Sequence, residues 1–385
     1  MKKIIPFFLL FLFGLVSLGQ LQRVELPLGR AIYLHEIVMV ALILFSLCFL
    51  KIALRSRLLI SFLLLNIWIL TSIFLAHFTN TLSPLTPVLY LLRFDAYIFF
   101  GVALYHLTKQ RVISPQTLTW FLYGSITIVA LLGWLQYLFI PDTRALVFLG
   151  WDDHYLRLIS TLFDPGFTGA VLALGSLLLQ QKIFASKNDR GIRFALLQWM
   201  WLLTTSALLF TYSRASFVAY VAGTLFLLMK ERKRAYIVIL ALFSFAVVCL
   251  PRPASEGVRL ERTASITARV DTIKSGIDSL SPFQFVTGKG WYSDKQETTR
   301  DMRGSLVPDH ASAPENSFVF LFTSLGIVGF LLFCWFGWEI IRKVKWNTVA
   351  FTAILTMSVH ALFSNTLFYP FILFYLGTII SSSTL

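Results

Sequence analysis

Long apolar segments separated by short polar ones dominate the chain. Many approach the roughly 20 residues that an α-helix needs to cross a bilayer. They lie at about residues 4–19, 33–50, 58–76, 85–108, 117–140, 161–181, 194–211, 214–229, 235–250, 316–341, 347–364 and 366–381. The runs 214–229 and 235–250 are short, which indicates tilted or broken helices. The pattern predicts an all-α, polytopic integral membrane protein with about 12 transmembrane helices.

The composition supports the same fold class. Hydrophobic residues make up 57% of the chain and charged residues 14%. A soluble core cannot bury so many apolar side chains, whereas a bilayer accepts them on the outside of a helical bundle. Sparse charge excludes intrinsic disorder. The three cysteines, Cys48, Cys249 and Cys334, lie in or beside apolar runs, which excludes a disulfide-stapled secreted fold. We expect residues 1–385 to form a single membrane domain.

The net charge of +14 is spread along the chain and does not form one patch. More than half of the 33 Lys and Arg residues lie in every second connection, for example within 51–57, 182–193, 230–234 and 342–345. Short basic loops are retained in the cytoplasm, so the alternation predicts that the amino terminus is cytoplasmic. We expect the protein to lie in the cytoplasmic (inner) membrane. The charge is therefore a topology signal, and we expect no nucleic-acid partner. Residues 1–19 also fit a signal peptide, so whether they are retained stays open.

One long hydrophilic segment, Pro251 to Glu315, lies on the predicted extracytoplasmic side. It contains equal numbers of basic and acidic residues. Loops of this length usually close a site or carry function, so residues 251–315 are expected to cap an active site. Within them, Ile266–Ser279 has apolar residues at helical spacing and predicts an amphipathic helix near the outer membrane face. The alternative is that residues 251–315 form an ordered cap that takes no part in catalysis.

Motifs of soluble nucleotide and metal enzymes are missing from the sequence. Thr287-Gly288-Lys289-Gly290 lacks an upstream glycine at P-loop spacing. The histidines and cysteines do not have the spacing of zinc ligands. Trp151-Asp152-Asp153-His154 offers two carboxylates to a divalent cation, but a solvated loop is the favoured interpretation. We therefore expect neither a metal nor another cofactor.

Several arginines on the predicted outer side are not explained by topology. Arg214 lies where two apolar runs reverse almost without a loop, and a charge at the membrane edge is costly unless it is paired. Arg93 lies inside an apolar run, with an ion pair to an Asp between helices as the alternative. Arg157 precedes a helix start broken by Pro165-Gly166, where free N–H groups can bind an anion. These residues indicate a ligand with a lipid tail and a phosphate head, such as a polyprenyl pyrophosphate.

Taken together, several segments resemble the O-antigen ligase and O-antigen polymerase family. They are Thr211-x-Ser213-Arg214-Ala215-Ser216, Arg157 followed by Phe163-Asp164-Pro165-Gly166, Arg269 followed by Gly288-Lys289-Gly290, and Glu315-Asn316-Ser317-Phe318 leading into Leu325-Gly326-Ile327-Val328-Gly329. The similarity covers about residues 90–340. It implies a GT-C-like, metal-independent glycosyltransferase of the cell envelope. Such an enzyme transfers an undecaprenyl-pyrophosphate-linked glycan to an acceptor hydroxyl outside the cytoplasmic membrane.

The resemblance also implies roles for particular arginines. Arg157, Arg214 and Arg269 match family arginines, and their implied role is to bind the substrate pyrophosphate and to stabilise charge on the leaving group. Arg93 is added to this set because of its depth in the membrane. The implied partners are a lipid-linked oligosaccharide donor, membrane lipids, and a glycan, lipid or protein as acceptor.

The chain departs from the family at the expected catalytic base. Members often have a histidine directly before the Asn-Ser pair, whereas this chain has Glu315 before Asn316. We expect Glu315, beside Asn316, to accept the proton of the attacking hydroxyl, provided that its carboxylate is buried, with His310 as the alternative base if the loop folds back. The segment Pro314–Ser317 also has the pattern of a capped helix start, which would be structural.

Two questions of function stay open from the sequence. The residues do not distinguish transfer of a finished glycan from the joining of repeat units into a polymer. A transporter or flippase of lipid-linked oligosaccharides would also need phosphate-binding arginines. The transporter hypothesis predicts charged groups on both sides of a central cavity and an internal repeat. No such repeat is found in the sequence.

Overall fold

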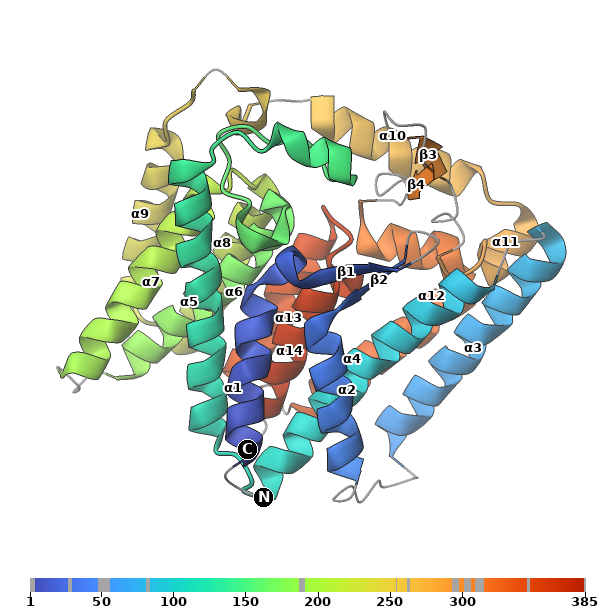
Figure 1. Ribbon diagram of the computed structural model, residues 1–385, viewed down its shortest axis with the longest axis horizontal. Coiled ribbons are helices and arrows are strands. Elements are labelled where there is room, and N and C mark those ends of the chain that lie inside the picture. Colours follow the sequence, from blue (N-terminus) through green and yellow to red (C-terminus); the bar gives the residue numbers. More distant parts are fainter. Residues whose placement is uncertain are drawn as a thin grey trace.

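The described part of the chain is helical apart from two short hairpins (Figure 1). The computed structural model describes residues 4–26, 30–47, 56–80, 84–186, 191–253, 255–261, 264–292, 298–300, 306–308, 315–344 and 347–383. The α-helices are α1 (Ile4–Ser17), α2 (Leu34–Leu47), α3 (Arg57–Asn80), α4 (Leu85–Lys109), α5 (Pro115–Phe139), α6 (Pro165–Ala185), α7 (Ile192–Phe210), α8 (Arg214–Glu231), α9 (Ala235–Cys249), α10 (Ala264–Asp278), α11 (Pro282–Thr287), α12 (Ser317–Lys343), α13 (Thr348–Ala361) and α14 (Pro370–Ser383).

The hairpins and the short helical turns lie in the connections. Strand β1 (Arg23–Leu26) pairs antiparallel with β2 (Arg30–Tyr33), and β3 (Thr298–Arg300) pairs antiparallel with β4 (Leu306–Pro308). Single 3-10 turns are η1 (Gly19–Gln22), η2 (Arg144–Leu149), η3 (Ser160–Leu162), η4 (Glu256–Val258) and η6 (Thr366–Phe368).

Every predicted apolar segment forms a helix, which confirms the all-α class. Among the described residues, α3, α4, α5, α6, α7 and α12 are the six helices that are long and apolar enough to cross a membrane. Helices α1, α2, α9, α13 and α14 are apolar but shorter. At 14 residues, α1 extends about 21 Å, which is less than a bilayer's hydrocarbon core of roughly 30 Å. The count of about 12 spans therefore stays a prediction.

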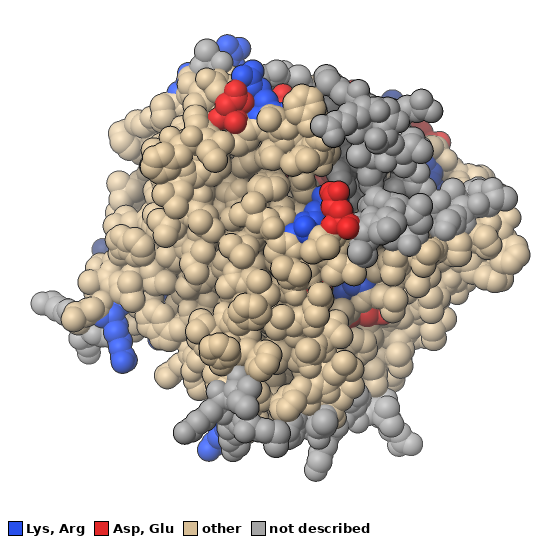
Figure 2. Space-filling model, viewed as in Figure 1, with Lys and Arg blue, Asp and Glu red and all other residues tan. Residues whose placement is uncertain are grey.

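The two ends of the bundle differ. The chain termini lie at one end, and α10 runs across the other, which we call the capped end (Figure 1). Most of the visible face is neither acidic nor basic, and the described charged side chains form only a few small groups on it (Figure 2). Such a surface is what a helical bundle presents to lipid. The predicted amphipathic segment within 251–315 is confirmed as the helix α10.

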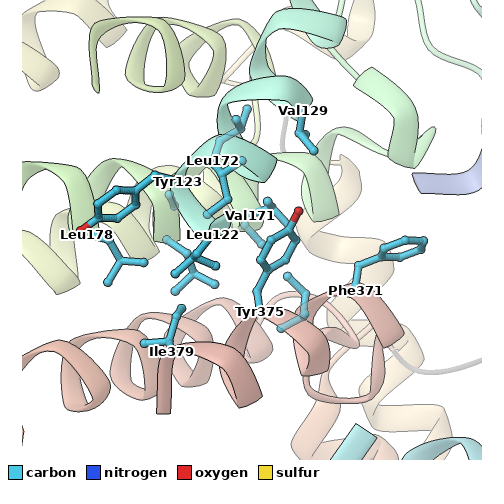
Figure 3. Close-up of a cluster of buried hydrophobic side chains, with 14 of the residues drawn as sticks. Leu122, Tyr123, Val129, Val171, Leu172, Leu178, Phe371, Tyr375 and Ile379 are labelled. Carbon is cyan, nitrogen blue, oxygen red and sulfur yellow. The ribbon is translucent and has the colours of Figure 1, made fainter. Parts of the chain in front are cut away.

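Helix α6 is the centre of the core. In its most apolar stretch 78% of the residues are buried, the highest share among the six long helices. Val171 and Leu172 of α6 meet Leu122 of α5 and Tyr375 of α14 in a dry cluster (Figure 3). Tight packing against α8 requires Gly169, because a Cβ there would lie 2.4 Å from Ser216 Oγ. The buried position of α6 fixes its first turn, where the candidate site begins.

Helix α12 is broken in its middle. Gly326 has φ 65° and ψ −173°, a conformation that suits glycine and interrupts the helix. Two carbonyl groups freed by the break accept backbone N–H groups from the loop after α11: Thr323 from Lys289 at 2.8 Å and Ser324 from Gly290 at 3.0 Å. Gly288 also has a positive φ of 79° there. We call this contact between residues 288–290 and 323–326 the glycine clamp.

Candidate functional site

The turn between α7 and α8 is as tight as the sequence predicts. Tyr212 adopts a left-handed conformation with φ 51°. Thr211 Oγ1 accepts the backbone N–H of Ser213 at 3.2 Å, and Ser213 Oγ accepts that of Ser216 at 3.4 Å as the N-cap of α8. These hydroxyl groups satisfy backbone donors that a reversal leaves exposed. Arg214 consequently begins α8 directly at the turn.

Arg157 supports this turn from inside the protein. Its side chain is buried, and its Nε donates to the Thr211 carbonyl at 3.0 Å. Its Nη2 also donates to the Tyr212 carbonyl at 3.4 Å. A Cβ on Gly257 would lie 2.9 Å from Arg157 Cδ, so the chain after α9 passes directly over the side chain. The structure therefore places Arg157 against the turn that leads into Arg214.

Arg269 joins these two residues from α10. The positive charges of Arg214 and Arg269 are close enough to repel one another. Arg214 Nη1 donates to the Leu260 carbonyl at 3.2 Å, and Arg269 forms an ion pair with Glu315. We call Arg157, Arg214 and Arg269 the arginine cluster. Like charges held this close favour a bound anion.

The start of α12 lies beside the arginine cluster. Asn316 is the N-cap: its side chain accepts the backbone N–H groups of Phe318 at 2.9 Å and Val319 at 3.1 Å. Its Nδ2 also donates to the Leu362 carbonyl at 2.9 Å. The predicted capped helix start is therefore present. The Glu315 side chain pairs with Arg269 and is 58% exposed, so the burial expected of it is not present. His310 lies outside the described residues.

The start of α6 adds a third capped helix near the cluster. Asp164 accepts the Phe167 N–H at 2.7 Å, and the helix begins at Pro165 rather than at residue 161 as predicted. Burial raises the pKa of the Asp164 carboxyl, while the Phe167 N–H and Arg157 act in the opposite direction. Ser216 of α8 links to this turn by donating to the Gly166 carbonyl at 3.2 Å. The positive ends of helix dipoles thus add to the arginine charges.

Arg93 has a different environment from the one expected for a pyrophosphate ligand. Its Nε lies 2.8 Å from Glu36 Oε1, and its Nη2 donates to the Ala31 carbonyl. The guanidinium also lies over the rings of Tyr33 and Tyr90. The ion pair between helices that was the alternative interpretation of Arg93 is therefore present. Its acidic partner is a Glu of α2 and not the expected Asp. Arg93 fastens the β1–β2 hairpin to α4, and we leave it out of the arginine cluster.

One group of described residues has the geometry of a metal site. Ligand atoms of Asp152, His154 and Asp164 all lie within 4.8 Å of one another. From the sequence, the candidate cation ligands are the neighbours Asp152 and Asp153, whereas the fold brings in Asp164 from the start of α6. Exposed acidic groups commonly lie together without an ion, so this geometry alone assigns no function to the group.

One buried residue at the site, His360 of α13, was not predicted from the sequence. It has no exposed surface. Its Nε2 lies 3.1 Å from Ser216 Oγ and its Nδ1 lies 2.6 Å from Thr366 Oγ1. Its only signal in the sequence is that it is a histidine inside an apolar run, where ionisable residues are rare.

These features are those of a helical membrane protein in which Arg157, Arg214 and Arg269 lie near one another at the capped end. Comparison with protein families finds a similarity: the family model described as O-antigen ligase matches residues 199–334. That stretch contains Arg214, Arg269, the glycine clamp and the start of α12. The match confirms the resemblance to the O-antigen ligase and O-antigen polymerase family of lipopolysaccharide biosynthesis, and it is narrower than the expected 90–340.

The match also bears on the class of activity. It supports a membrane enzyme of the O-antigen ligase or polymerase type, which implies a lipid-linked glycan donor, and it does not favour the transporter alternative. A search of curated proteins finds no match to the chain.

Proposed function

We propose that this protein is a GT-C-like membrane glycosyltransferase. It transfers or polymerises an undecaprenyl-pyrophosphate-linked glycan onto an acceptor hydroxyl at the capped end, which faces outside the cytoplasmic membrane. The proximity of Arg157, Arg214 and Arg269 carries the proposal. Guanidinium groups bind phosphate oxygens in a bidentate manner and keep their charge, so the cluster suits a lipid pyrophosphate.

The reaction requires the glycosidic bond to the pyrophosphate to break. The acceptor oxygen attacks the anomeric carbon, and the pyrophosphate leaves with the bonding electron pair. Negative charge grows on the leaving oxygen, and the fixed positive charges of the arginine cluster stabilise it. Glu315 is the proposed base that takes the acceptor proton, because its ion pair with Arg269 holds a carboxylate beside the cluster.

Reconstitution tests the proposal directly. Purified protein is given an undecaprenyl-pyrophosphate oligosaccharide and candidate glycan, lipid or protein acceptors. We expect released undecaprenyl pyrophosphate and a joined product in equal amounts. If the protein in vesicles instead moves the donor across the bilayer without consuming it, the protein is a flippase and the glycosyltransferase proposal is wrong.

Replacement of Glu315 by glutamine tests the proposed base. The amide cannot accept the proton, so we expect kcat to fall by about 100-fold. Glu261→Gln is the matched control, because Glu261 also pairs with an arginine, Arg252, in the chain after α9. Its kcat should stay at the wild-type value. Full activity in Glu315→Gln together with loss of activity in His310→Ala would move the role of base to His310.

Removal of divalent cations should leave turnover unchanged. In our proposal the arginine cluster supplies the positive charge that a metal ion supplies in other transferases. Turnover is measured with EDTA and again after Mg²⁺ or Ca²⁺ is added back. Asp152→Asn should likewise retain activity. Loss of turnover with EDTA and its recovery with a cation would instead give Asp152, His154 and Asp164 a role in the reaction.

A further inference from the structure

His360 lies where the first turns of α6 and α8 meet. Its Nε2 lies 3.1 Å from Ser216 Oγ, and Ser216 Oγ lies 3.2 Å from the Gly166 carbonyl oxygen at the start of α6. Ser216 Oγ is in turn 2.8 Å from the hydroxyl of Ser213, the N-cap residue directly before Arg214. Through Ser216, this ring edge is therefore linked to the starts of both α8 and α6.

The other edge of the ring faces the start of α12. Its Nδ1 lies 2.6 Å from the Thr366 hydroxyl oxygen, within hydrogen-bond distance. Thr366 belongs to the turn after α13, and that turn holds the first residues of α12. Ser317 Oγ donates to the Ser364 carbonyl at 3.1 Å and accepts the Leu367 N–H at 3.1 Å. The imidazole thus connects the Arg214 turn to the segment that carries Glu315.

We propose that His360 is a positioning residue that sets the spacing between Arg214 and the start of α12. The inference deepens the proposed function and rests on it, because this spacing decides whether one donor molecule contacts both the pyrophosphate site and the base. Histidine suits this role because a rigid ring makes hydrogen bonds in two opposite directions while it is fully buried. Loss of either bond leaves a buried polar group without its partner.

Two conservative variants separate the two edges of the ring. The amide of glutamine reaches about as far as Nε2, and the shorter amide of asparagine reaches about as far as Nδ1. In His360→Gln we expect the contact with Ser216 to remain, and in His360→Asn we expect it to be lost. Hydrogen exchange of the amides of residues 211–216 should then be about tenfold faster in His360→Asn than in wild type, and close to wild type in His360→Gln.

The same variants are compared for binding of undecaprenyl pyrophosphate. We expect about tenfold weaker binding in His360→Asn and near wild-type binding in His360→Gln. Ser216→Ala, which removes the same contact from α8, should reproduce the loss, and it replaces His360→Asn if that variant does not fold. His35→Asn is the matched control, because His35 is equally buried and also hydrogen-bonded through both ring nitrogens. It should not change the exchange of residues 211–216.

The outcomes separate the two proposals. If wild type does not bind undecaprenyl pyrophosphate, the proposed function fails, while the exchange rates still decide the positioning role. If wild type binds it and His360→Gln and His360→Asn behave alike in both measurements, His360 is not a positioning residue. Faster exchange at residues 211–216 in His35→Asn would also overturn the inference, because the effect would then not be specific to His360.

Discussion

Replacement of Arg214 by alanine should lower kcat/KM for the lipid-linked donor by about 1,000-fold. Removal of one fixed donor from a site that stabilises developing charge costs about 100- to 1,000-fold in kcat. We expect the upper end of this range for Arg214 because its position is fixed. Ser213 caps the helix that begins with Arg214, and Arg157 supports the turn before it. The fixed turn means that no reorganisation is needed when the leaving group acquires its charge.

The measurement is steady-state turnover with an undecaprenyl-pyrophosphate oligosaccharide. Arg214→Lys keeps the charge but loses the bidentate geometry, so its activity should lie between those of wild type and Arg214→Ala. Arg144→Ala is the control, because Arg144 is an exposed arginine near the same end and pairs with Asp142 at 2.7 Å. It should retain wild-type kinetics. A fall of less than tenfold in Arg214→Ala would contradict the role given to the arginine cluster.

Replacement of Gly326 by alanine should have the largest effect on stability. A Cβ at this position would lie 2.2 Å from the Val286 carbonyl oxygen, and the φ of 65° is itself unfavourable for a residue with a side chain. The atom in the way belongs to the backbone, so a rotamer change cannot relieve the contact. We expect a loss of at least about 3 kcal/mol, or separation of the loop after α11 from α12.

Thermal unfolding of the detergent-solubilised protein and limited proteolysis of residues 264–292 measure this effect. Gly337→Ala is the matched control in the same helix, because a Cβ there would have no neighbour within 4 Å. Alanine at that position should be neutral or slightly stabilising. An unchanged unfolding temperature and an unchanged cleavage pattern in Gly326→Ala would show that the glycine clamp does not hold these segments together.

The hydrophobic pattern was sufficient to predict the helices but not the contacts between them. Each apolar run forms a helix because the signal is local and repeated over many residues. The amphipathic segment within 251–315 was likewise predicted, and it is α10. The break in α12 was not predicted, because the run 316–341 is apolar on both sides of Gly326. Only the approach of residues 288–290 shows why that helix is interrupted.

Long-range pairing explains the remaining differences at the site. Arg93 was placed correctly inside a helix, but its partner Glu36 lies in an earlier helix, and one sequence does not show which acidic residue pairs with it. His360 was not predicted for a similar reason: its proposed role depends on contacts with Ser216 and Thr366, which belong to other segments. Arg157 and Arg214 were singled out by their positions beside apolar runs, whereas Arg269 came from the family resemblance, which carries tertiary information that periodicity does not contain.

The interruption at Gly326 also affects how the protein tolerates its lipid surroundings. Bilayers differ in thickness, and a long helix commonly adjusts to a mismatch by tilting. In α12 the tilt of residues 327–343 can be taken up at Gly326, because the preceding carbonyl groups are bonded to the loop at 289–290 rather than along the helix. We therefore expect the orientation of Glu315 to be insensitive to acyl-chain length, even where the lower half of the helix reorients.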